Sequence, residues 1–124
     1  GLKAILNSKV SKASNALVCF DNEEVGSSTK QGADSPLLSN ILERIVEKEE
    51  KGREAYFRAL SRSFLISADL AHAVHPSSPE KADPINKPMI NKGPVIKVSE
   101  RQSYTSDAIS SAIYKQICEK ANVP

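Results

Sequence analysis

The amino-acid sequence predicts an α/β fold, because short apolar runs alternate with segments that have helical spacing. Three runs, at residues 16–20, 63–68 and 94–98, have the length and composition of strands. Two segments, at residues 36–50 and 106–121, carry apolar residues three and four positions apart, which is typical of helices that pack on one face. Strands separated by helical segments favour a sheet with helices packed against it, and 124 residues suffice for one domain.

The first predicted strand, Ala-Leu-Val-Cys-Phe at 16–20, is continuously apolar, as expected of a central strand covered on both faces. Directly after it, Asp21, Glu23 and Glu24 place three carboxylates within four positions. Like charges this close destabilise a site unless a cation or a proton relieves them. Two interpretations stay open: a solvated turn, or a metal site in which carboxylates bind the cation and a second carboxylate acts as general base.

The helix predicted at residues 36–50 has a start signal as well as a periodic apolar face. Ser35 is a suitable N-cap, and Pro36 suits the first turn of a helix. The apolar face comprises Leu37, Leu38, Ile41, Leu42 and Ile45. Residues 47–54, EKEEKGRE, are rich in charge and contain Gly52, so we expect an exposed helix end and a linker there, without a functional role.

The second predicted strand, residues 63–68, ends at Asp69, just as the first ends at the acidic cluster. In open α/β sheets, ligands gather outside the carboxyl ends of the strands. Carboxylates from these two strand ends could therefore converge on one cation.

The remaining third of the chain combines an irregular segment with the last strand and helix. Five prolines between residues 76 and 94 predict a long irregular connection. Lys97 lies within the apolar run at 94–98, where lysine is seldom found without a partner anion; an edge-strand lysine is the alternative. Ser106 is the expected N-cap of the last helix.

Composition narrows the classes of protein to which this chain can belong. Seventeen basic and fifteen acidic residues are interspersed and leave a net charge of +2, so nucleic acid is not an expected partner. No apolar run approaches the roughly 20 residues of a membrane helix, and no membrane association is expected. Cys19 and Cys118 lack the spacing of a metal or disulfide motif, and no signal peptide is visible, so we expect a cytoplasmic protein.

The stretch DLAHAVHP, residues 69–76, is the second candidate for chemistry. In a helix, Asp69 and His72 would share a face, as would His72 and His75, but Asp69 and His75 would lie too far round to bind one metal together. Each histidine could equally be a hydrogen-bonded residue of the fold. Tyr104 could likewise be a core tyrosine whose hydroxyl has a partner.

Four stretches, taken in order, resemble one known family. FDNEEVGS, SADLAHAVHP, NKGPVIKV and RQSYTSD look like the aspartyl aminopeptidase family, cytosolic di-zinc metallopeptidases that remove N-terminal residues, typically acidic ones. The resemblance covers about residues 15–110. It implies a partial three-layer α/β/α sandwich of the zinc-exopeptidase type, two zinc ions per full-length subunit, peptide substrates and a homo-oligomeric parent protein.

The resemblance also implies roles for individual residues. Glu23 matches the family's general base, which takes a proton from the metal-bound water and passes it to the leaving amine. Glu24 and Asp69 match zinc ligands. Three further positions match residues that contact the substrate: His72, Lys97 and Tyr104. A cationic Lys97 would suit an acidic side chain or a carboxylate of the substrate.

Two zinc ions need more ligands than this chain offers. The family also uses a His-x-Asp pair, a bridging aspartate and a final histidine, and no His-x-Asp occurs here. Ser77 and Ser78 also replace an asparagine and an aromatic residue that relatives often carry. We therefore expect residues 1–124 to be a fragment of the catalytic domain, without the inserted dimerisation domain and both terminal parts of the parent, and inactive by itself.

Two alternatives to an acid-preferring aminopeptidase stay open. One is a related di-zinc exopeptidase that prefers neutral N-termini. The other is a non-catalytic binding or scaffold module that has lost its metals, although such a module would have no reason to keep Glu23.

Overall fold

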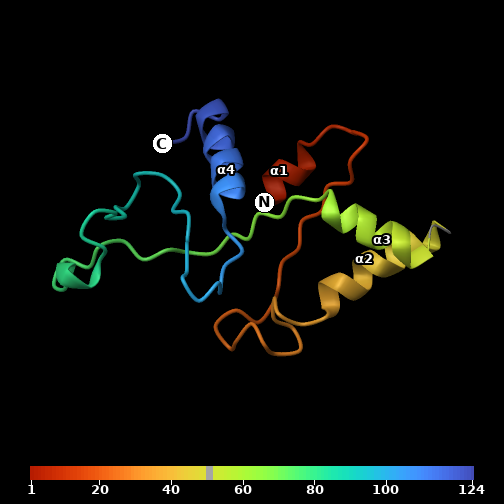
Figure 1. Cartoon of the computed structure of the whole chain (residues 1–124), viewed down its shortest axis with the longest axis horizontal. Coiled ribbons are helices and arrows are strands. Elements are labelled where there is room, and N and C mark those ends of the chain that lie inside the picture. Colours follow the sequence, from red (N-terminus) through yellow and green to blue (C-terminus); the bar gives the residue numbers. More distant parts are fainter. Residues whose placement is uncertain (50–51) are drawn as a thin grey trace. The chain divides into compact units, whose positions relative to one another are not determined.

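The computed structural model describes residues 1–49 and 52–124, and the chain divides into two units after Leu65. Within these residues, the first unit, Gly1–Leu65, has three helices, and the second, Ile66–Pro124, has one turn of 3-10 helix and one α-helix (Figure 1). In chain order these elements are α1 (Leu2–Leu6), α2 (Leu37–Lys48), α3 (Gly52–Ser61), η1 (Pro79–Lys81) and α4 (Ala108–Lys120).

Helix α2 confirms the helix predicted at residues 36–50, with a later start. The cap position is Pro36 and not Ser35, so the predicted cap was wrong. Proline presets the backbone for the first turn but has no side chain that could cap it; Ser35 Oγ only accepts a long 3.5 Å hydrogen bond from the Leu37 amide. The helix ends at Lys48, and residue 50, the predicted end, lies outside the described residues.

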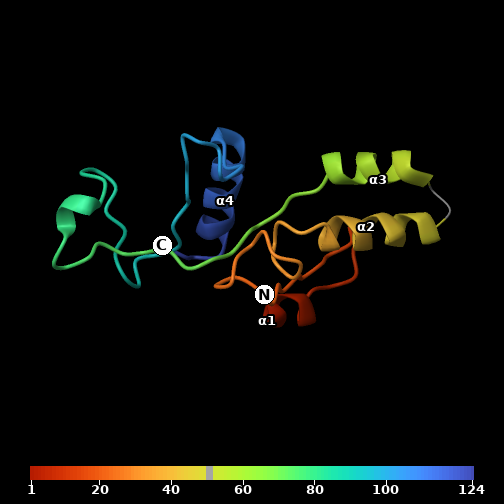
Figure 2. The same ribbon diagram turned by 90° about the horizontal axis from the view of Figure 1, so that it is seen from below.

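Helix α3 was not predicted, because the charge-rich stretch at 47–54 was assigned to a linker. Gly52 begins this helix with φ at +67°, a conformation that glycine adopts without strain. Helices α2 and α3 lie side by side as a hairpin (Figure 2). The Tyr56 side chain, only 6% exposed, is the one buried apolar side chain among the described residues, and its ring lies 5.4 Å from that of Phe57.

Helix α4 confirms the helix predicted at residues 106–121, but its cap is Asp107 and not Ser106. Asp107 Oδ1 accepts a 2.7 Å hydrogen bond from the Ser110 amide, and Ser110 Oγ accepts one of 2.9 Å from the Asp107 amide. This reciprocal capping box satisfies two amides that the helix leaves unpaired. Asp107 completes both bonds because its carboxylate lies three residues before the hydroxyl of Ser110. Ser106 does not have this spacing.

The three apolar runs predicted as strands do not form a sheet. Residues 1–49 and 52–124 contain no strand, and much of the apolar surface of these runs is exposed, including Leu65 at 76% and Val98 at 73%. A sheet forms only where each strand has a hydrogen-bonded neighbour, and none of the three runs has one here. The α/β/α arrangement therefore stays a prediction. Between residues 76 and 94 the chain is irregular apart from η1, as the prolines predicted.

Candidate active site

Glu23 and Glu24 lie in a loop that folds back on itself between residue 21 and the start of α2 (orange in Figure 1). Two backbone hydrogen bonds close this loop: the Asn22 amide donates to Gln31 O at 3.4 Å, and the Asp34 amide donates to Ser27 O at 3.0 Å. Both glutamates are exposed. The loop therefore presents two carboxylates to solvent from a backbone that is tied at its base.

Side chains add a second layer of bonds within this loop. Thr29 Oγ1 donates to Gly26 O at 2.6 Å and accepts from Asn22 Nδ2 at 3.0 Å. Asn22 Nδ2 also lies 3.4 Å from Gln31 Oε1. The amide group of Asn22 therefore connects two side chains that lie seven and nine residues further along the chain.

In the second unit, Lys97 reaches Asp69 across 28 residues of sequence. Lys97 Nζ lies 2.7 Å from Asp69 Oδ2 and 3.0 Å from the carbonyl oxygen of Leu70. The hydrogen bond from Lys97 is the main reason that the pKa of Asp69 is lowered, followed by a hydrogen bond from the Leu70 backbone and the charge of Lys97. The partner anion expected for this lysine is thus present within the chain.

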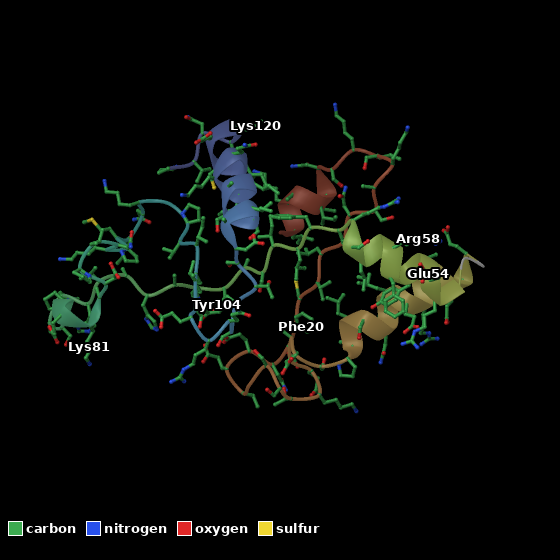
Figure 3. All side chains as sticks on the ribbon, viewed as in Figure 1. Phe20, Glu54, Arg58, Lys81, Tyr104 and Lys120 are labelled. Carbon is green, nitrogen blue, oxygen red and sulfur yellow. The ribbon has the colours of Figure 1, made fainter. Side chains whose placement is uncertain are left out.

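Tyr104 and His72 flank this ion pair in different ways. The Tyr104 ring centroid lies 5.8 Å from Lys97 Nζ, a cation–π distance. Tyr104, labelled in Figure 3, is 45% exposed and is not a core residue. His72 is exposed and lowers the pKa of Asp69 slightly through its charge. It does not share a helix face with Asp69, because residues 66–78 are not helical.

The predicted zinc ligands do not make a complete zinc site within this chain. Glu24 belongs to the first unit and Asp69 to the second, where Lys97 engages one of its oxygens. Zinc sites use at least three protein ligands. Among residues 1–49 and 52–124, no group of three or more histidine, cysteine, aspartate or glutamate side chains could hold a metal ion.

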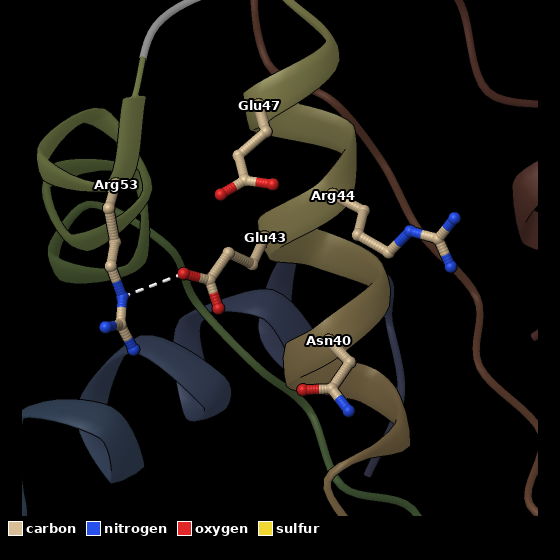
Figure 4. Close-up of a pocket in the computed structure, with 5 residues that line it drawn as sticks. All are labelled: Asn40, Glu43, Arg44, Glu47 and Arg53. Carbon is tan, nitrogen blue, oxygen red and sulfur yellow. Dashed lines mark ion pairs between the residues drawn. The ribbon is translucent and has the colours of Figure 1, made fainter.

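A polar hollow of about 490 Å³ lies on the α2–α3 hairpin (Figure 4). The residues that line it are Asn40, Glu43, Arg44, Glu47 and Arg53. Glu43 and Arg53 point toward one another and form an ion pair of 2.8 Å between Oε1 and Nε. No residue assigned to the chemistry lines this hollow, which is therefore separate from the candidate active site.

Sequence reasoning missed Asn22 and Thr29, the residues that tie the loop carrying the two glutamates. A signal was present in the sequence: Thr29 lies between Gly26 and Gly32, and glycines this close favour a tight reversal of the chain. Gly26 adopts a φ of +135°, and Gly32 is buried against the backbone of Ser27. The signal indicates a turn but not which side chains meet across it.

Comparison with known proteins extends the motif resemblance to the whole chain. Residues 1–124 match the family described as Aminopeptidase I zinc metalloprotease (M18). The chain is 63% identical over 123 residues to a probable M18 family aminopeptidase 2 of Clostridium novyi, and 60% identical over 124 residues to one of Clostridium acetobutylicum. A protein of Mycobacterium tuberculosis with the same description is 42% identical over 128 residues.

A solved structure is also similar. A chain in the cryo-EM structure of the Ape4 and Nbr1 complex matches with a TM-score of 0.71 and 41% sequence identity, over 85% of this chain and 20% of that one. The alignments include 99% to 100% of this chain. They cover only 28%, 29% and 30% of the length of the relatives from Clostridium novyi, Clostridium acetobutylicum and Mycobacterium tuberculosis. The chain thus spans less than a third of the length of the proteins it matches. Because the family match runs from its first residue to its last, the chain belongs to the M18 family of aminopeptidase I zinc metalloproteases.

Proposed function

We propose that this chain is part of the catalytic domain of a zinc-dependent aminopeptidase that removes N-terminal residues, with a preference for Asp and Glu. Membership of the M18 family over all 124 residues supports the reaction class. The contact of Lys97 with Asp69, 28 residues away in sequence, and with the ring of Tyr104 supports a functional cluster in the second unit and is the observation that carries the proposal.

In this proposal Glu23 is the general base, which takes a proton from the attacking water and returns it to the leaving amine. An exposed carboxylate on a tied loop suits that role, because it can reach the water without breaking a bond that holds the loop. His72, Lys97 and Tyr104 contact the substrate. The positive charge of Lys97 supports the preference for acidic N-terminal residues, since an ammonium group pairs with a carboxylate.

Glu24 and Asp69 are the zinc ligands that this chain contributes. The proposal needs further ligands from other parts of the parent protein, to hold two ions per subunit, and the share of the relatives that this chain covers leaves room for them. When bound, zinc supplies Lewis-acid polarisation of the scissile carbonyl and activation of water. Lys97 Nζ bonds Asp69 Oδ2, so Oδ1 and the second lone pair of Oδ2 are the positions left for a metal.

The same proposal extends to the fold and the setting of the parent protein. We propose that residues 16–20, 63–68 and 94–98 pair with further strands of an α/β/α sandwich, which would cover their exposed apolar side chains. No helix in the described part of the chain is long and apolar enough to cross a membrane. A cytoplasmic homo-oligomer fits the family resemblance, and the complex in which Ape4 was solved supports assembly with other chains.

The decisive experiment uses the full-length protein and its Glu23→Gln variant. We expect the wild type to bind about two zinc ions per chain and to cleave Asp- and Glu-anilides. Glu23→Gln should keep its metal and lose most of its rate, because only the proton acceptor is removed. A leucyl substrate run in parallel separates the alternatives: a strong leucyl preference indicates an exopeptidase for neutral N-termini, and a protein without metal or activity indicates a scaffold.

The isolated chain provides the complementary test. With excess zinc, residues 1–124 should show no chelator-sensitive cleavage of an Asp-anilide, since no group of three ligands is present among the described residues. Efficient cleavage by the isolated chain would contradict the assignment of further ligands to other parts of the parent protein.

A further inference from the structure

The loop that carries the proposed general base has an internal clamp made of two side chains. The hydroxyl of Thr29 uses both its donor and its acceptor capacity: it donates to Gly26 O at 2.6 Å and accepts from Asn22 Nδ2 at 3.0 Å. Asn22 precedes Glu23 directly in the chain. One hydroxyl therefore connects the residue next to the base with the middle of the loop.

Burial separates the clamp from the carboxylates that it supports. Asn22 and Thr29 are half-buried, whereas Glu23 and Glu24 are exposed. Partial shielding from water strengthens the hydrogen bonds of the clamp relative to those of a fully exposed loop. The side chains of both glutamates, in contrast, face solvent, so the loop holds their backbone and leaves their carboxylates accessible to substrate.

The backbone bonds alone leave the start of the loop weakly held. The Asn22 amide reaches Gln31 O at 3.4 Å, a long hydrogen bond, and the shorter backbone bonds lie further along, between Gly26 and Ser35. The side chain of Asn22 supplies the remaining connections, to Thr29 Oγ1 and to Gln31 Oε1. Without them, the residue that precedes Glu23 would be joined to the loop by one long bond.

We propose that Asn22 and Thr29 are positioning residues that hold the backbone of Glu23 in the conformation needed for proton transfer. This inference rests on the proposed function, because it takes Glu23 to be the base. Neither residue touches the reacting atoms; both act through Glu23. A displacement of a catalytic group by about 1 Å can lower the rate by about 100-fold, so a clamp at this point affects turnover more than substrate binding.

The test compares two substitutions of Thr29 in the full-length protein. Thr29→Val keeps the shape and removes the hydroxyl, and Thr29→Ser keeps the hydroxyl. Ser28→Ala is the matched control, because it removes a neighbouring hydroxyl that is exposed and donates only a long 3.4 Å hydrogen bond, to Asp34 Oδ2. The measurements are kcat and KM on an Asp-anilide, zinc content, and amide hydrogen exchange of residues 22–34 followed by mass spectrometry.

We expect Thr29→Val to lower kcat at least about tenfold with unchanged KM and zinc content, and to speed exchange in the loop. Thr29→Ser and Ser28→Ala should match the wild type in all four measurements. Faster exchange in Thr29→Val with unchanged kcat would overturn the inference, because the clamp would then be structural only. Unchanged exchange would overturn it too. A wild type with no aminopeptidase activity would instead refute the proposed function, and the positioning role with it.

Discussion

Lys97 Nζ donates a 2.7 Å hydrogen bond to Asp69 Oδ2 and lies 5.8 Å from the ring centroid of Tyr104, so one ammonium group joins an anion and an aromatic face. Its second acceptor is the carbonyl oxygen of Leu70, at 3.0 Å. These contacts bring together three of the residues that the motif resemblance assigned to zinc or substrate binding. The side chain of Lys97 is 28% exposed and that of Asp69 is 52% exposed, so the pair remains accessible to solvent and ligands.

The first prediction concerns the carboxylate of this pair. Lys97→Met removes the donor that contributes most to the lowered pKa of Asp69, so that pKa should rise toward its ordinary value. The measurement is a titration of the Asp69 carboxyl carbon by NMR in the 124-residue chain. Lys92→Met, a change at an exposed lysine of the same unit, should leave the Asp69 titration unchanged. Equal midpoints in wild type and Lys97→Met would contradict the ion pair.

The second prediction concerns the cap of α4 and its dependence on pH. Hydrogen bonds from the Ser110 side chain and then from its backbone lower the pKa of Asp107. A carboxyl group whose pKa is lowered in the folded state stabilises that state above its unfolded pKa, and this contribution is lost as the pH falls through the folded pKa. The first turn of α4 should therefore loosen at acidic pH, which the chemical shift of the Ser110 amide will report.

Two substitutions of Asp107 separate the charge from the hydrogen bond. Asp107→Asn keeps a side-chain oxygen as acceptor and should make the Ser110 amide insensitive to acidic pH, with the helix retained. Asp107→Ala should loosen the first turn at every pH, because no acceptor remains for the Ser110 amide. If Asp107→Ala leaves the helicity of residues 108–120 unchanged, the capping box does not hold this helix.

The third prediction concerns the α2–α3 hairpin. Tyr56 is the buried apolar side chain of the described residues, and truncating a large buried aromatic residue typically costs about 3–5 kcal/mol. Tyr56→Ala should therefore abolish the protection of α2 and α3 amides against hydrogen exchange. Phe57→Ala is the matched control, since Phe57 is 49% exposed and should cost far less. Equal loss of protection in both variants would show that Tyr56 is not the centre of the hairpin.

The fourth prediction concerns Gly32. A Cβ atom at this position would lie 2.1 Å from the carbonyl oxygen of Ser27, and that oxygen belongs to the backbone and cannot rotate away. Gly32→Ala should break the 3.0 Å bond between the Asp34 amide and Ser27 O and speed hydrogen exchange in the loop. Lys30→Ala, a change at an exposed residue of the same loop, should not. Wild-type exchange in Gly32→Ala would mean that the loop closes in another way.

The two helices predicted from sequence were found because the information that specifies them is local. In α2, Leu37, Ile41 and Ile45 recur at four-residue steps, and Pro36 sets the start. Exact ends were less predictable: Pro36 and Asp107 occupy the cap positions that were assigned to neighbouring serines. Helix α3 was missed because its charged first turn resembles a linker, although Ala55, Tyr56, Ala59 and Leu60 have helical spacing.

Of the candidate site, the sequence could specify which residue types carry the chemistry but not which of them meet. The acidic pair at 23–24, the acid at 69 and the lysine at 97 were recognisable from their local patterns and from the order of the motifs. That Lys97 bonds Asp69, and that Thr29 bonds Asn22, could not be inferred, because each contact depends on the path of the intervening chain.

The sequence by itself thus determined the family of this protein, the helices at 37–48 and 108–120, and the residues proposed for its chemistry. The tertiary structure alone decided that α2 and α3 form a hairpin, that Asn22 and Thr29 clamp the loop of Glu23, and that Lys97 engages Asp69. The physical reason is the range of the interactions. Helix spacing and caps act within about four residues, whereas these contacts join residues separated by longer stretches of chain and exist only once the chain has folded.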